Sequence, residues 1–164
     1  MRIISLFLLL SLFAFTSCKD KKSTAESDRT SPEETIVPFE VVNYRKTPCF
    51  GVCPTFEMIV MSDGMARYEG QRNVEMEGVW TGAWTNEQIE LVRKTAERIG
   101  FFQMEDEYNN KLVTDLPATY TTVYSGKKTK TVMNRYKGPE ELQELYMVLD
   151  DLIKRVEWKK LENN

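Results

Sequence analysis

The sequence predicts an α+β domain, a mostly antiparallel sheet of about five or six strands with two helices packed on one face. Three observations support this fold class. Several segments alternate apolar and polar residues, which is typical of strands with one buried face. Two longer segments repeat apolar residues at helical spacing. These segments follow one another in the order strands, helix, strands, helix.

The first group of strands precedes residue 84. Predicted strands cover residues 39–44, 55–61 and 65–70, and a fourth carries Val74, Met76, Gly78 and Trp80 on one side with Glu75 and Glu77 on the other. Ser62-Asp63-Gly64 contains the Asp-Gly pair that favours a tight hairpin turn. The second and third strands should therefore pair with each other.

The first helix is expected from Thr85 to Gly100. Its start, Thr85-Asn86-Glu87-Gln88, fits a capping box, in which two side chains satisfy backbone N–H groups reciprocally. Gly100 suits the C-terminal cap. The apolar residues at helical spacing are Ile89, Val92, Ala96 and Ile99, and the expected core residues after the helix are Phe101 and Phe102.

A second hairpin and a closing helix complete the domain. Residues 119–124 and 129–136 are rich in Thr, Val and Tyr, and Ser125-Gly126-Lys127-Lys128 joins them. Gly138-Pro139-Glu140-Glu141 should open the last helix, with Pro at or near its first position and acidic side chains complementing the helix dipole. The apolar stripe of this helix is Leu142, Leu145, Leu149, Leu152 and Val156.

Composition excludes several classes of function. The 164 residues include 22 Lys plus Arg and 25 Asp plus Glu, so the net charge is −3. No nucleic-acid partner is expected, because such a chain lacks the excess positive charge that displaces phosphate counterions. Histidine is absent. Its absence excludes imidazole bases, Ser-His or Cys-His nucleophile pairs and imidazole metal ligands.

Residues 1–17 are predicted to be a lipoprotein signal peptide. Arg2 precedes an apolar run from Ile3 to Phe15, which as a helix would span roughly 20 Å and falls short of the ~30 Å bilayer core. Phe15-Thr16-Ser17-Cys18 resembles the lipobox of bacterial lipoproteins, with Phe15 where Leu is usual. The alternative is an ordinary cleaved signal with an incidental cysteine.

Residues 18–38 are predicted to be the lipidated Cys18 and a flexible tether. Residues 19–38 contain no aromatic side chain, so they cannot bury enough apolar surface to offset the entropy of ordering. The fatty-acyl (palmitate-type) chains of a bacterial lipoprotein would hold Cys18 firmly in a membrane. Lys19 stands where Asp often marks inner-membrane retention, so the outer membrane is the expected location rather than the inner.

The single domain, residues 39–164, has one chemically distinctive feature, a pair of nearby cysteines. Cys49 and Cys53 lie four positions apart, and in an oxidising exported compartment such a pair is expected to form a disulfide. One tight turn brings these positions within about 6 Å between Cα atoms, a distance that a disulfide can bridge. The structural interpretation is a local staple between the first two strands.

Two functional interpretations of this loop stay open beside the structural one. The C-x-x-x-C-P pattern resembles the copper-handling motif of thioredoxin-like assembly factors, and paired thiolates suit Cu(I), so thiol redox chemistry or Cu(I) handling is the alternative function. Those factors add a histidine that this chain cannot supply, although Met58 or Met61 could serve as a soft ligand. In the other interpretation, the closed loop presents Phe50 and Val52 rigidly to a partner.

The motifs also resemble a known family. Cys49-Phe50-Gly51-Val52-Cys53-Pro54, then Asp63-Gly64 and Tyr68-Glu69-Gly70, are similar to a family of uncharacterised exported bacterial domains with a C-[FY]-G-x-C-P signature. Members often carry lipoprotein signals. The resemblance covers residues 39–160 and includes Asp115-Leu116-Pro117. Because this is a domain of unknown function, the resemblance implies no reaction, cofactor or catalytic residue.

Enzyme interpretations find little support, and no catalytic residue, cofactor or metal site is predicted. Paired carboxylates can hydrolyse glycosides, and an acidic stretch surrounds Tyr108, but acidic runs between a helix and a strand are usually solvated loops. Ser125 and Lys127 lie at a hairpin tip, which is too wet for a Ser-Lys dyad. The acidic residues of this stretch are Glu105, Asp106, Glu107 and Asp115.

Several aromatic residues could instead form a sugar- or peptide-binding face, although aromatic residues on strands more often pack in the core. They are Tyr68, Trp80, Trp84, Tyr120, Tyr124 and Tyr136. The sequence therefore predicts a lipid-anchored envelope module that binds or scaffolds. Its partner beyond the membrane is a protein, a peptide or a glycan, and the sequence does not select among them.

Overall fold

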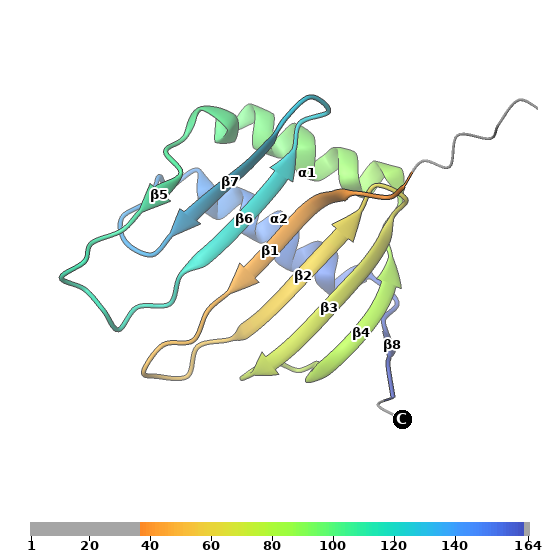
Figure 1. The fold of residues 1–164 in the computed structure, drawn as a ribbon, viewed down its shortest axis with the longest axis horizontal. Coiled ribbons are helices and arrows are strands. Elements are labelled where there is room, and N and C mark those ends of the chain that lie inside the picture. Colours follow the sequence, from red (N-terminus) through yellow and green to blue (C-terminus); the bar gives the residue numbers. More distant parts are fainter. Residues whose placement is uncertain (1–36, 163–164) are drawn as a thin grey trace, which may run out of the picture. The chain divides into compact units, whose positions relative to one another are not determined.

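The computed structural model describes residues 37–162 as one mixed α+β unit. Eight strands form one sheet in the order β5-β7-β6-β1-β2-β3-β4-β8 (Figure 1). The strands are β1 (Glu40–Lys46), β2 (Thr55–Met61), β3 (Met65–Arg72), β4 (Gly78–Ala83), β5 (Glu107–Tyr108), β6 (Thr119–Tyr124), β7 (Thr129–Asn134) and β8 (Lys159–Lys160). The helices are α1 (Asn86–Arg98) and α2 (Leu142–Arg155), with a 3-10 turn, η1 (Phe101–Gln103).

The predicted signal peptide, Cys18 and almost all of the predicted tether lie outside the described residues. Within residues 37–162, neither helix is long and apolar enough to cross a membrane.

The α+β class is confirmed, but the expected number of strands is too low. The six longer strands are those that the sequence predicts, and β5 and β8 were missed. Each of these two edge strands has only two residues, too few to show an alternating pattern. Neighbouring strands are antiparallel throughout the described sheet except for β5 and β7, which are parallel.

The prediction was also wrong about where β4 begins. Val74 and Met76 lie in the connection between β3 and β4, not in a strand. Asn73 turns the chain there with a positive φ of 57°. The connection then passes so close to β3 that a Cβ atom on Gly70 would lie 1.8 Å from the carbonyl oxygen of Met76. The absence of a side chain at Gly70 therefore allows this connection to fold over the sheet.

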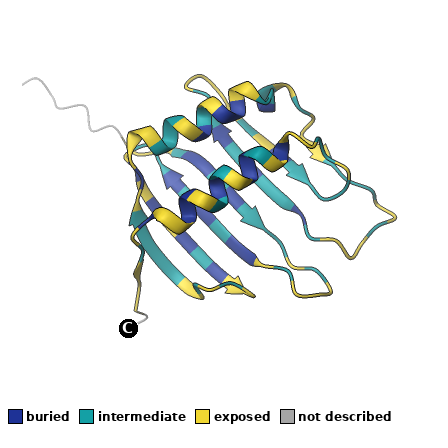
Figure 2. Cartoon of the chain, turned by 180° about the vertical axis from the view of Figure 1, so that it is seen from behind, coloured by how far each residue is buried: buried dark blue, intermediate teal, exposed yellow. Residues whose placement is uncertain are grey.

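Both helices cover the same face of the sheet, as predicted (Figure 2). Their buried sides face the strands and enclose the core, in which Tyr44, Met58, Leu145 and Leu149 are fully buried. The opposite face of the sheet has no covering layer among the described residues. The strands accordingly alternate between buried and half-exposed residues.

The start of α1 agrees with the sequence signals better than the start of α2 does. The capping box at Thr85 and Gln88 is present with both hydrogen bonds, and Phe101 is fully buried, as expected. However, α2 begins at Leu142, whose N–H donates to the carbonyl of Pro139. Pro139 therefore lies in a turn before the helix rather than at its first position.

The segment after α2 returns to the sheet. Val156 and Trp158 pack against Gly82 of β4, where an added Cβ atom would lie 2.6 Å from Val156 Cγ1. Trp158 is thereby placed beside the aromatic residues of β3 and β4, although it lies far from them in the sequence.

Candidate functional site

Cys49 and Cys53 form a disulfide in the β1–β2 loop, with their Cα atoms 5.8 Å apart. The predicted pairing is confirmed. The loop exposes two large apolar side chains, Phe50 (90% exposed) and Val52 (86%). The backbone N–H of Gly51 points at Cys49 Sγ, 3.2 Å away.

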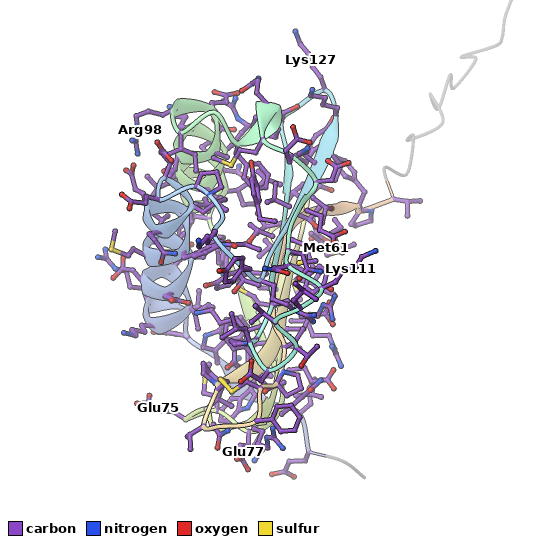
Figure 3. The ribbon with its side chains drawn as sticks, turned by 90° about the vertical axis from the view of Figure 1, so that its left-hand side faces the viewer. Met61, Glu75, Glu77, Arg98, Lys111 and Lys127 are labelled. Carbon is purple, nitrogen blue, oxygen red and sulfur yellow. A yellow bond between two sulfur atoms is a disulfide. The ribbon has the colours of Figure 1, made fainter. Side chains whose placement is uncertain are left out.

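A hydrogen bond joins the disulfide loop to the β3–β4 connection. Asn73 Nδ2 donates to the carbonyl oxygen of Cys53 at 3.0 Å. Figure 3 shows the disulfide at the same end of the domain as Glu75 and Glu77, which belong to this connection. The two loops therefore form one structural unit at the end of the sheet.

Beside this unit lies an open cleft of about 620 Å³, between the sheet and the C-terminal half of α2. Aromatic and aliphatic residues form most of its lining, and a few polar groups converge on it. Such a composition is typical of ligand-binding sites. The apolar lining is Pro54, Phe56, Tyr68, Val74, Met76, Trp80, Ile153, Val156 and Trp158, and the polar lining is Lys46, Asn73, Glu75, Asp150 and Lys154.

The aromatic residues of the cleft form a continuous series. The rings of Phe56 and Tyr68 stack with centroids 5.3 Å apart, and Tyr68 contacts Trp158 at 5.7 Å. Both tryptophan N–H groups are used internally, because Trp80 Nε1 donates to Glu77 O and Trp158 Nε1 to Ile153 O. The indoles therefore offer ring surface rather than hydrogen-bond donors.

An ion pair links the sheet to α2 at the cleft. Lys46 Nζ lies 3.0 Å from Asp150 Oδ2 and also 5.0 Å from the ring centre of Tyr44. Burial, with a smaller contribution from the Asp150 carboxylate, raises the pKa of Tyr68 to about 12. The same two causes raise the pKa of Tyr44 above its ordinary value. Both phenols therefore resist ionisation in alkaline solution more strongly than an exposed tyrosine does.

The aromatic residues predicted to form one binding face lie in different parts of the structure. Tyr68 and Trp80 line the cleft, whereas Trp84 is buried in the core and 4% exposed. Tyr120 lies on the uncovered face of the sheet under the guanidinium of Arg45, at 4.0 Å. Two aromatic residues of the cleft, Phe56 and Trp158, were not among the predicted binding residues. Phe56 does lie in a predicted strand, but no local pattern marks Trp158.

The structure gives three of the acidic and Ser-Lys candidates partners in nearby loops and strands. Asp106 pairs with Lys130, and the carboxylate of Glu107 accepts a hydrogen bond from Asn109. Ser125 Oγ donates to the carbonyl of Lys128 and closes the hairpin turn. These residues stabilise loops.

The suggested soft ligands for Cu(I) are not brought together. Met58 is fully buried in the core. Met61 lies at the far end of β2 from the disulfide loop (Figure 3). No group of three or more Cys, Asp or Glu side chains suited to a metal ion occurs within residues 37–162.

Comparison with known proteins identifies a family but no characterised relative. No curated protein shows significant similarity to the chain. Residues 40–153 match one protein family, and this range includes the disulfide loop, the β3–β4 connection and most of α2. The chain therefore belongs to the family described as a domain of unknown function (DUF6438).

Proposed function

We propose that this protein is a lipid-anchored binding module of the bacterial cell envelope and that its ligand occupies the aromatic cleft. The cleft beside the disulfide-closed loop is the observation that carries this proposal. Its volume lies within the range of about 300–1,000 Å³ usual for ligand sites. The disulfide and the Asn73–Cys53 hydrogen bond hold one wall in place, which lowers the ordering cost of binding.

The anchor in this proposal is Cys18, and its support is the lipobox-like sequence that precedes it. Labelling cells with an alkynyl fatty acid tests this step. The wild-type chain should take up the label and fractionate with the outer membrane, and Cys18→Ser should lose both properties. Cys49→Ser is the matched control because it removes a different cysteine. Unlabelled wild-type protein, or label retained by Cys18→Ser, would refute the anchor.

Filling the cleft tests its role in binding. Val74→Phe adds a ring to the cleft wall, while Ile59→Phe adds the same kind of bulk to the uncovered face of the sheet. Ligands that bind only the folded state raise its melting temperature. Neutral saccharides, apolar peptides and fatty acids should be screened in this way. We expect one class to stabilise the wild type and Ile59→Phe but not Val74→Phe, and an equal response of all three proteins would contradict the proposal.

A second candidate function is thiol redox or Cu(I) handling by Cys49 and Cys53. One observation favours it, because an N–H group pointing at Cys49 Sγ would stabilise a thiolate there. The reduction potential separates the two functions. A structural disulfide should have a potential below about −300 mV, whereas oxidoreductase pairs lie near −120 to −270 mV. Tight Cu(I) binding by the reduced pair would also favour this candidate.

A further inference from the structure

We propose that the aromatic cleft binds a short neutral oligosaccharide; this inference rests on the proposed role of the cleft as the ligand site. It follows from three properties of the cleft: the ring surfaces it offers, the balance of its charges and the mixture of its polar groups.

The ring surfaces come from Trp80 and Trp158, which approach the cleft from β4 and from the segment after α2. Both are half-buried, and their N–H groups already have internal partners. An aromatic face carries partial negative charge and attracts the weakly positive C–H groups of a ligand. A pyranose ring presents such C–H groups on a flat face, so it can stack on an indole.

The charges of the cleft cancel. Lys46 and Lys154 supply two positive charges, and Asp150 and Glu75 supply two negative charges. Lys46 and Asp150 already neutralise each other at 3.0 Å. A strongly cationic ligand would therefore find no net attraction, and an anionic ligand would find only the ammonium of Lys160, which lies 5.5 Å from the ring centre of Trp80. A neutral ligand needs no net charge in the cleft.

The polar groups of the cleft include both donors and acceptors. Asn73 and Lys154 can donate, and Glu75 and Asp150 can accept. A sugar hydroxyl does both at once, so neighbouring hydroxyls can satisfy this alternating set. A purely apolar peptide side chain would instead displace the water that these groups bind and would offer them no hydrogen bonds in return, which is costly. The observations therefore favour a saccharide over an apolar peptide.

Titration of the purified protein with neutral trisaccharides tests the inference. The probes are β-1,4-linked glucose, β-1,4-linked N-acetylglucosamine and α-1,4-linked glucose trimers, with a neutral, blocked Phe-rich tripeptide for comparison. Calorimetry measures binding, and tryptophan emission reports on the ring surfaces. At least one trisaccharide should bind saturably and shift the emission.

Variants connect the binding to the cleft. Trp80→Ala should weaken trisaccharide binding about tenfold or more, a loss of about 1.4 kcal/mol. Trp80→Phe should keep most of the affinity because it keeps a ring. Tyr120→Ala removes an aromatic side chain from the uncovered face and should change nothing. Circular dichroism of each variant verifies that it folds.

Three outcomes would overturn the inference. Saturable binding that survives Trp80→Ala would place the saccharide elsewhere. Binding of the peptide alone, lost in Trp80→Ala, would overturn the saccharide but leave the proposed binding function intact. If no probe binds, and if no ligand in the melting-temperature screen stabilises the wild type more than Val74→Phe, both proposals would be contradicted.

Discussion

Asn73 Nδ2 donates a hydrogen bond to the carbonyl oxygen of Cys53, 20 residues earlier in the chain, and so joins the disulfide loop to the wall of the cleft. Asn73 occupies left-handed backbone with a φ of 57°, a conformation that Asn tolerates better than most residues. The same residue thus turns the chain after β3 and connects the two loops.

Asn73→Asp should lower the free energy of unfolding by about 0.5–1.5 kcal/mol, the net value of one hydrogen bond. Aspartate also tolerates this backbone conformation but cannot donate to the carbonyl of Cys53, so the change removes the bond while it keeps a residue suited to the turn. Denaturant unfolding measures the effect, and hydrogen exchange should speed up at residues 73–77. In a chain that lacks the disulfide the same substitution should cost less. Equal costs in both backgrounds would show that the two loops are not coupled.

The double variant Cys49→Ser/Cys53→Ser should lose about 2 kcal/mol of stability, the chain-entropy value for so short a loop. Denaturant unfolding with and without reductant checks the prediction. A wild-type protein whose stability does not respond to reductant would contradict a structural role for the disulfide.

Gly70→Ala should destabilise the protein by about 1–3 kcal/mol, the usual cost of overpacking. The new Cβ atom would lie 1.8 Å from the backbone oxygen of Met76, so the β3–β4 connection must move away from β3. Because this connection forms a wall of the cleft beside Trp80, the tryptophan emission of the protein should change as well.

Gly51→Ala is the matched control for this substitution. Among residues 37–162, the one atom within 4 Å of the added Cβ is Cys49 Sγ at 3.8 Å, an ordinary contact. The free energy of unfolding should therefore change by no more than about 0.5 kcal/mol. Equal stabilities of Gly70→Ala and the wild type would contradict the close approach of the connection to the sheet.

Sequence patterns predicted the parts of the fold that depend on local chemistry. The alternation of β2, the capping box at Thr85 and Gln88 and the apolar stripe of α2 all correspond to structure. Val74-Glu75-Met76-Glu77 alternates in the same way but is not a strand. Val74 and Met76 are half-buried and both glutamates are exposed, although Glu75 also lines the cleft. The alternation therefore follows burial and does not show whether the backbone pairs as a strand.

The cleft itself could not be predicted from the sequence. It combines residues that lie far apart in the sequence: Phe56 and Tyr68 come from neighbouring strands, while Trp158 follows the last helix. Trp158 reaches them because Gly82 leaves room for it to pack on β4. Contacts of this kind depend on how the C-terminal segment packs, and no periodicity records them. The Cys49–Cys53 pair was predictable because its spacing permits disulfide geometry and an exported chain is expected to meet an oxidising compartment.

The raised pKa of Tyr68 predicts that stability falls in alkaline solution. In the unfolded chain this phenol ionises near its ordinary value of 10, whereas in the folded protein it ionises near 12. The stabilising contribution is fully present below pH 10. Between pH 10 and about 12 it declines, because the unfolded chain releases the proton first and is thereby favoured.

The slope of unfolding free energy against pH measures this effect. Over this interval the slope should be negative in the wild type and shallower in Tyr68→Phe, which has no proton to lose. Asp150→Asn should also make it shallower, though less so, because the Asp150 carboxylate contributes less to the shift than burial does. Tyr44 keeps some slope in both variants, since burial and Asp150 raise its pKa too. An identical slope in the wild type and Tyr68→Phe would mean that Tyr68 is solvated and that burial in the wall of the cleft does not raise its pKa.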